Sequence, residues 1–121
     1  MKTLSIVSPN GSRIASGQKS LEIRRWIPDT PLTDLLIVEN RHFLTNQLEE
    51  ESGIAVCIVD VLGHHDWQET ELQAACGTYW EAGWIAWEIS NVRPIQQFIT
   101  RAKRRIYNTQ IDANKLLHRT Q

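Results

Sequence analysis

The feature that most constrains the fold is an apolar run over residues 54–62, Ile-Ala-Val-Cys-Ile-Val-Asp-Val-Leu, which stops at Gly63. The run is rich in β-branched side chains, which favour strands, and it is far shorter than the roughly 20 residues that cross a bilayer as a helix. A second run, over residues 34–39, has the same apolar character. Both runs therefore predict buried strands, and the longer one predicts a central strand.

Weaker alternation of apolar and polar side chains predicts further strands, because a strand has a side-chain period of two. These strands are expected over residues 3–7, 20–26, 84–89 and 105–111. Between the two apolar runs, residues 46–53 carry three consecutive glutamates and are expected to form a solvated loop or a turn of helix.

Two short segments predict helices. Small and polar residues at 11–16, closed by Gly17, suit one or two helical turns. Asp66 and Glu69 have the spacing of a capping box and precede an apolar stripe, so a helix is expected over residues 67–76. Residues 112–121 are expected to form a short basic helix or a frayed tail.

These elements predict a single α+β domain over residues 1–121. The connections are too short for repeated helical crossovers, which favours a mostly antiparallel sheet of five to six strands with two or three short helices. A small β-barrel is the expected closed form, since closure removes exposed strand edges. With no membrane-spanning run and no secretory leader pattern, we expect a cytoplasmic protein that is a monomer or a weak dimer and has no membrane partner.

Charge is distributed unevenly along the chain. Residues 29–88 hold twelve of the fourteen acidic residues and one base, Arg41, whereas residues 89–121 hold seven bases and one acid. The first 28 residues hold five bases and one acid. If both ends lie on one side of the fold, they form a basic surface suited to a phosphate-bearing partner; otherwise the charges are a solvated surface.

The most specific local pattern is Gly17-Gln18-Lys19-Ser20-Leu21-Glu22-Ile23-Arg24, which fits G-x-K-x-x-E-x-R. This segment resembles the signature of the ASCH domain family, in which a glycine and a lysine at a helix end lead into a strand with the glutamate and arginine. The resemblance continues through residues 34–40 and through residues 84–95. This chain has Thr33-Asp34 where many members have arginine and glycine, and residues 102–105 replace a turn that tends to contain glycine.

The resemblance implies a PUA-like β-barrel and an RNA or nucleoside ligand. One bacterial branch of the family hydrolyses the acetyl amide of N4-acetylcytidine, and a ribonuclease activity has also been associated with the family. The catalytic lysine of the amidohydrolase branch matches Lys19, whereas a threonine of that branch stands where this chain has Glu22. The resemblance therefore implies an RNA- or nucleoside-binding module, with an amidohydrolase as the alternative.

The candidate catalytic residues are Lys19, Glu22 and Arg24. Glu22 and Arg24 share one strand face and favour each other's charged form, and Lys19 can reach the same pocket from the preceding turn. Glu22 would activate a water while the two cations stabilise an oxyanion or hold a phosphate. The alternative is an ion-pair network that has no ligand.

Aromatic and basic side chains supply candidate ligand contacts. Trp26 and Trp87 are expected to contact the ligand together with Lys19 and Arg24, because aromatic rings stack on unpaired bases. The expected nucleic-acid contacts are Arg25, Arg101, Lys103, Arg104 and Arg105. A basic edge strand that repels self-association would have the same composition as this last cluster.

Two further features argue against other chemistries. His64, His65 and Asp66 do not form a convincing metal site, so we expect no metal and no cofactor. The two cysteines lack metal or redox spacing and are interpreted as buried thiols. A third class of function, a protein-interaction adaptor that uses the acidic segment over residues 39–71, remains as an alternative.

Overall fold

The computed structural model describes residues 1–46 and 48–111. Six strands form one sheet: β1 (Lys2–Val7), β2 (Leu21–Arg24), β3 (Leu32–Asn40), β4 (Glu50–Asp66), β5 (Ile85–Lys103) and β6 (Ile106–Asn108). The order across the sheet is β2-β5-β4-β3-β1-β6, and only the β1–β3 pair is parallel. The helical elements are α1 (Asn10–Ala15) and a single 3-10 turn, η1 (Glu69–Glu71).

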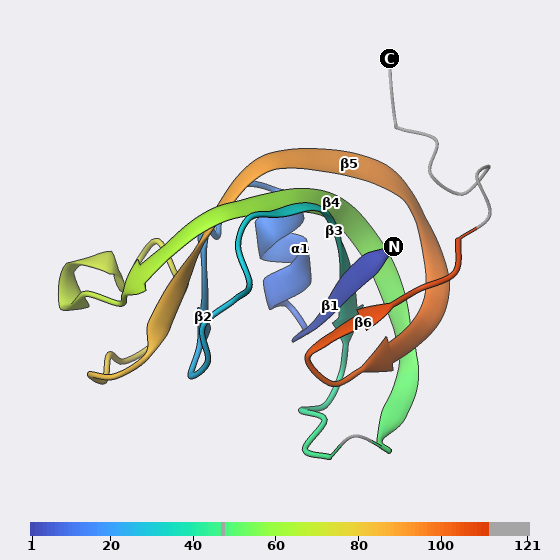
Figure 1. The fold of residues 1–121 in the computed structure, drawn as a ribbon, viewed down its shortest axis with the longest axis horizontal. Coiled ribbons are helices and arrows are strands. Elements are labelled where there is room, and N and C mark those ends of the chain that lie inside the picture. Colours follow the sequence, from blue (N-terminus) through green and yellow to red (C-terminus); the bar gives the residue numbers. More distant parts are fainter. Residues whose placement is uncertain (47, 112–121) are drawn as a thin grey trace.

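The expected closed barrel is wrong: within the described residues the sheet is curved but open. β2 and β6 are its two edges and do not pair with each other. The long strands β4 and β5 arch over α1 (Figure 1), and their register shifts at three places, which lets the pair bend. The curvature brings β2 back toward β1, where the Arg24 Nη2 donates to the Ser5 carbonyl at 2.9 Å. Side chains, rather than the backbone hydrogen bonds of a ladder, therefore connect β2 to β1.

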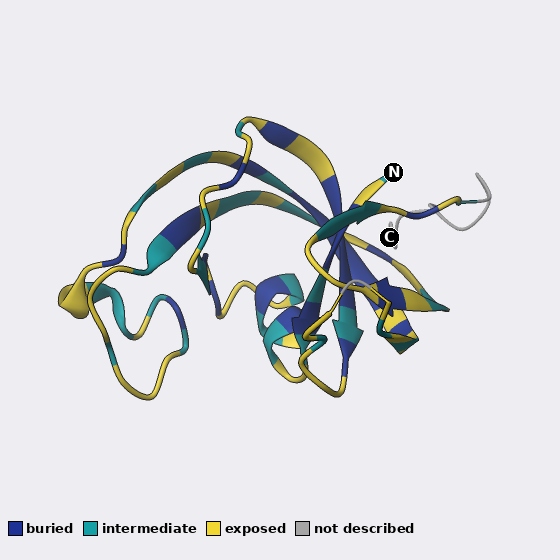
Figure 2. Ribbon diagram, turned by 60° about the horizontal axis from the view of Figure 1, so that its bottom comes forward, coloured by how far each residue is buried: buried dark blue, intermediate teal, exposed yellow. Residues whose placement is uncertain are grey.

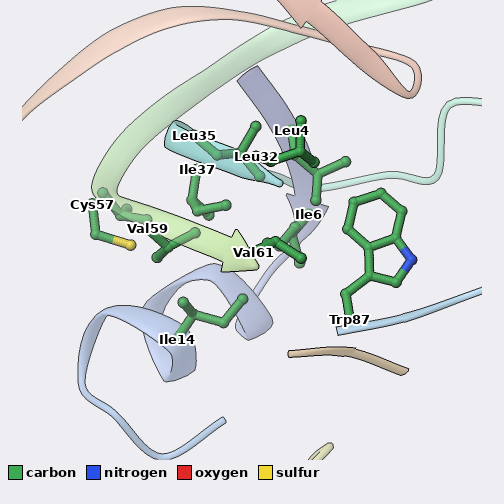
Figure 3. Close-up of a cluster of buried hydrophobic side chains, with 11 residues drawn as sticks. Leu4, Ile6, Ile14, Leu32, Leu35, Ile37, Cys57, Val59, Val61 and Trp87 are labelled. Atoms are coloured by element: carbon green, nitrogen blue, oxygen red, sulfur yellow. The ribbon is translucent and has the colours of Figure 1, made fainter. Parts of the chain in front are cut away.

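The two runs are largely apolar because the middle of the sheet is buried on both faces. Leu35 and Ile37 belong to one core cluster with Ile14 of α1, whereas Leu36 and Val38 belong to a second cluster on the opposite face. Figure 3 shows the first cluster, with the Trp87 indole beside Leu4 and Ile6 of β1. Buried residues lie along the strands where these converge near α1, and exposed residues follow the connecting loops (Figure 2).

The predicted helix over residues 67–76 is wrong. Only η1 and a series of turns lie there, and the capping box joins Gln68 and Glu71 because Asp66 is still the last residue of β4. The apolar stripe nevertheless packs, since Ala75 belongs to a third core cluster and Leu72 and Trp80 pack against it. Consecutive turns place residues at a spacing of three or four on one side, so the pattern suits both structures.

Other boundaries move because the strands continue past the apolar runs. The strand expected over residues 84–89 continues as β5 to Lys103, passing Pro94 at a register shift where the missing N–H is tolerated. Four residues of the expected loop, 50–53, belong to β4. The expected tail over residues 112–121 lies outside the described residues. Neither helical element in the described part of the chain is long enough to cross a membrane.

Candidate functional site

A pocket of about 470 Å³ lies where β2 approaches β1 and three further segments of the chain. Its lining includes residues 5–7 of β1 and 22–25 at β2, together with residues 42–44, 75–77 and 103–105. The β2 segment and the basic segment were predicted from the sequence, and the curved sheet brings them together.

Lys19, Glu22 and Arg24 form a continuous chain of charges in this pocket. The Lys19 ammonium lies 3.6 Å from Glu22 Oε1, and the Arg24 Nε donates to Glu22 Oε2 at 2.8 Å. Lys19 also donates to the Ala75 carbonyl at 2.5 Å. Lys19 and Glu22 are almost fully buried, with 5% and 8% of their side chains exposed. Each oxygen of the buried carboxylate thus has its own cation.

Local structure explains how these three side chains converge. Gly17 adopts a left-handed conformation with φ of 83° after α1, and this reverses the chain. The Lys19 amide then donates to the Arg13 carbonyl at 3.0 Å, which anchors the segment before β2. β2 pairs with β5 so that Glu22 lies opposite Trp87, and residues directly opposite one another share a face of the sheet. The glutamate and arginine therefore face the interior of the curve.

The lining of the pocket as a whole is strongly basic. Among the described residues that line the pocket, Glu22 is the one carboxylate, against six lysine and arginine residues: Lys19, Arg24, Arg25, Lys103, Arg104 and Arg105. Within the described part of the chain, Lys103 and Arg104 make no ion pair. The excess of positive charge in a concave surface attracts anionic groups such as phosphates.

Two of these arginines lie over indole rings. The guanidinium carbon of Arg25 lies 4.5 Å from the Trp84 ring centroid, and that of Arg105 lies 4.5 Å from the Trp26 ring centroid. Arg105 itself has a positive φ of 59°. Stacking on an indole restricts each guanidinium to one region, which orients its remaining N–H donors.

Trp87 was predicted to contact a ligand, and this prediction is wrong. The side chain is 0% exposed, packs edge-on against Trp26 with a centroid distance of 4.7 Å, and donates to the Trp26 carbonyl at 3.2 Å. The alternation of residues 84–89 assigns Trp87 to one face, but it does not distinguish a core face from a pocket face. Trp26 is partly buried against the same core cluster and is outside the pocket lining.

Arg101 is also separate from the other basic residues. Its Nε donates to Glu50 Oε1 at 3.1 Å across the β4–β5 ladder, and it does not line the pocket. β5 ends at Lys103, and residues 103–105 at this end of the strand line the pocket, whereas Arg101 lies two residues earlier on the strand. The structure therefore places Arg25, Lys103, Arg104 and Arg105 at the pocket and Arg101 away from it.

A group of lining residues was not predicted from the sequence because these residues follow no motif. Asn40, His42 and Phe43 line the pocket at the end of β3. Cys76 lines it from the turns between η1 and β5, and it is partly exposed rather than buried as expected. Cys57, in contrast, is buried, and its burial raises the pKa of its thiol to about 12. A pocket assembled from loops leaves no periodic signal in the sequence.

Glu51 holds the segment that carries His42. Its carboxylate accepts from the backbone amides of Arg41 and His42 at 2.7 and 3.0 Å, and it pairs with the His42 ring at 2.9 Å. The hydrogen bond from the His42 side chain is the main cause that lowers the pKa of Glu51 to about 2. The bend after β3 is thus a fixed structure rather than an open loop.

The His65 ring lies between two carboxylates of the same chain, those of Glu88 and Glu71. Its Nδ1 lies 2.7 Å from Glu88 Oε2, and its Nε2 lies 2.9 Å from Glu71 Oε1. The Glu88 contact is the largest cause that raises the pKa of His65, and burial opposes it. Among the residues that the structure describes, no group of three or more ligating side chains could hold a metal ion.

Comparisons with known proteins agree with the family resemblance. The family model of the ASCH domain matches residues 4–99. The fold is similar to the crystal structure of a mutant of the ZmASCH protein from Zymomonas mobilis, with a TM-score of 0.50 and 16% identity, covering 80% of this chain and 73% of that chain. A search of curated proteins found no match.

Proposed function

Because this chain belongs to the ASCH domain family, a PUA-like family often linked to RNA binding, we propose that its basic pocket binds RNA or a modified nucleoside. Lys19 and Arg24 would hold a polar or phosphate group of the ligand on the pocket floor, and Glu22 would hold both cations in position. Arg25, Lys103, Arg104 and Arg105 would contact the phosphate backbone.

The observation that carries this proposal is the excess of positive charge in the described lining, where six cations face one carboxylate. Glu22 compensates part of the charge of Lys19 and Arg24, so the four exposed cations of the rim remain available to a ligand. The ion pairs of Glu22 with Lys19 and Arg24 do not include the four exposed cations, and an excess of positive charge on a concave surface attracts anions. The excess favours binding of an anion over a purely structural role.

Fluorescence anisotropy with a labelled RNA oligonucleotide at two salt concentrations tests the proposal. We expect binding that weakens as salt rises, because each phosphate contact releases counterions. The double variant Lys103→Ala/Arg104→Ala should bind more weakly and lower the slope of log affinity against log salt by about 1.4, that is about 0.7 for each lost contact to a single strand.

The matched control is Arg101→Ala, which removes one basic residue from the same strand but outside the pocket. We expect it to bind RNA as the wild type does. Absence of salt-sensitive binding to any RNA, or an equal loss in the control, would contradict the proposal.

Hydrolysis of an acylated pyrimidine nucleoside is the second candidate function. The close pair of Lys19 and Glu22 favours it, because a carboxylate that activates water beside a cation that stabilises an oxyanion suits amide hydrolysis. Water would add to the acetyl carbon of N4-acetylcytidine, and cleavage of the C–N bond would release acetate and cytidine. Against this, both Glu22 oxygens already have cationic partners.

Chromatography after incubation with N4-acetylcytidine distinguishes this activity from binding alone. If the chain is an amidohydrolase, cytidine accumulates and both Lys19→Ala and Glu22→Ala lower its rate of release. Release that neither variant alters, or no release at all, would discard this candidate. The binding assay above is independent of this result.

The acidic segment does not favour the adaptor alternative. Glu39 accepts from the Ser12 amide at 2.7 Å, and Glu51 and Glu71 also form contacts within the chain. Their carboxylates are used to hold α1, the segment after β3 and the turn at η1. A partner that docked on them would have to replace these hydrogen bonds.

A further inference from the structure

We infer that Phe43 is the residue of this pocket on which a nucleobase stacks, and that the occupant is a single-stranded RNA segment. Its base would lie on the Phe43 ring while its phosphates contact residues 103–105. This inference rests on the proposed RNA-binding function and adds the contact and the strandedness of the ligand.

Phe43 lines the pocket and yet is 81% exposed. An aromatic side chain in water contributes little to folding, because folding gains come from apolar area removed from water. A flat apolar ring at the rim of a basic pocket offers a stacking surface beside phosphate contacts, which is the combination that single-stranded nucleic acids use.

The segment that carries Phe43 is held on both sides. Glu51 accepts the amides of Arg41 and His42 before it, and Glu49 accepts the Thr45 amide at 2.8 Å and the Thr45 hydroxyl at 2.6 Å after it. The backbone around the ring is therefore ordered before any ligand arrives. A stacking residue on an ordered segment loses little conformational freedom on binding.

Charge and size select the class of ligand. Phe43 lines the same pocket as Lys103, Arg104 and Arg105. A nucleotide whose base stacks on the Phe43 ring therefore brings its phosphates close to these three cations. A space of about 470 Å³ is suited to a small-molecule group such as one nucleotide unit. A base inside a duplex has both faces stacked, so it cannot lie on Phe43 unless it leaves the helix.

The test compares Phe43→Ala and Phe43→Trp with the wild type, using a single-stranded RNA oligonucleotide and the same oligonucleotide annealed to its complement. Tyr79→Ala is the matched control, because Tyr79 is an aromatic residue that is 70% exposed and lies outside the pocket lining. Circular dichroism melts verify that each variant is folded.

We expect Phe43→Ala to weaken binding of the single strand by about 5- to 150-fold, the range that corresponds to the loss of one base–aromatic stack. Phe43→Trp and Tyr79→Ala should bind like the wild type, and the duplex should bind more weakly than the single strand. If the wild type binds no RNA, the proposed function fails together with this inference. If the wild type binds RNA but Phe43→Ala matches Tyr79→Ala, or the duplex binds equally well, only this inference is overturned.

Discussion

Glu22 is the residue on which the pocket floor depends, because it is the buried partner of two cations. Without its carboxylate, Lys19 would keep the Ala75 carbonyl as its partner and lose its charge compensation, and Arg24 would keep only its bond to the Ser5 carbonyl. Removal of one partner of a buried ion pair leaves an uncompensated charge, which is strongly unfavourable.

We therefore expect Glu22→Ala to lower the free energy of unfolding by about 3 kcal/mol, the lower end of the range for broken buried pairs. Urea denaturation followed by tryptophan fluorescence measures it. The control is Glu50→Ala, which breaks the exposed pair with Arg101 and should cost less than about 1 kcal/mol. Equal losses in the two variants would show that the floor network is no more important than a surface pair.

Arg105 and Asp34 are two residues whose backbone the sequence did not predict. Both adopt positive φ, 59° and 55°, and both lie at or next to positions where the family resemblance leads one to expect glycine. Asp tolerates this conformation, whereas arginine adopts it at a cost of roughly 1–2 kcal/mol. The side chain of Arg105 lies over Trp26 and lines the pocket, so the arginine has a use that offsets the strain.

Replacement of this arginine by glycine separates stability from binding. In Arg105→Gly the relief of strain should offset the lost indole contact and the added chain entropy, so the free energy of unfolding should change by no more than about 1 kcal/mol. RNA affinity should fall, with a salt slope smaller by about 0.7. Unchanged affinity and slope would show that Arg105 makes no phosphate contact.

At the level of elements, the turns between β4 and β5 form one wall of the pocket, and His65 fastens them to the sheet. His65 lies on β4, Glu88 on β5, and Glu71 in η1, and the histidine bonds to both carboxylates. The wall itself contributes Trp67, Cys76 and Trp84 to the lining.

This fastening should depend on pH. The hydrogen bond to Glu88 raises the pKa of His65 above its usual value of about 6.5, so its stabilising contribution is complete below that value and is lost as pH rises through the raised pKa. Hydrogen exchange over residues 67–84, corrected for the intrinsic rate, should therefore become faster at alkaline pH. In His65→Gln this pH dependence should disappear. The same pH dependence in both proteins would contradict the role of His65.

The elements with a strong local pattern could be predicted from the sequence. The runs over residues 34–39 and 54–62 are confirmed as parts of β3 and β4, and the alternation over residues 20–26 is confirmed as β2. The helix over residues 67–76 was wrong because its spacing suits consecutive turns as well. The length of β5 was missed because Pro94 and polar residues interrupt its pattern, and pairing with β4 overrides that local signal.

At the level of the whole molecule, the site is a product of curvature. The motif around Lys19 predicted the buried charged residues of the pocket, and the charge distribution predicted that the segment over residues 103–105 is basic. Which cations meet at the pocket depends on how far β4 and β5 bend, and no local pattern encodes that bend. For the same reason the sequence could not show that Arg105 lies at the pocket whereas Arg101 does not. It also could not show that Phe43 lies at the rim of the pocket whereas Trp87 lies in the core.

The central claim is that RNA or a nucleoside ligand occupies the concave surface around Lys19, and amide chemical-shift mapping tests it most directly. Titration of the isotopically labelled protein with a short RNA oligonucleotide should shift the amides of residues 19–26, 42–44 and 103–105. Shifts confined to the outer surface near Ile54 and Ile99, with these three segments unchanged at saturation, would contradict it.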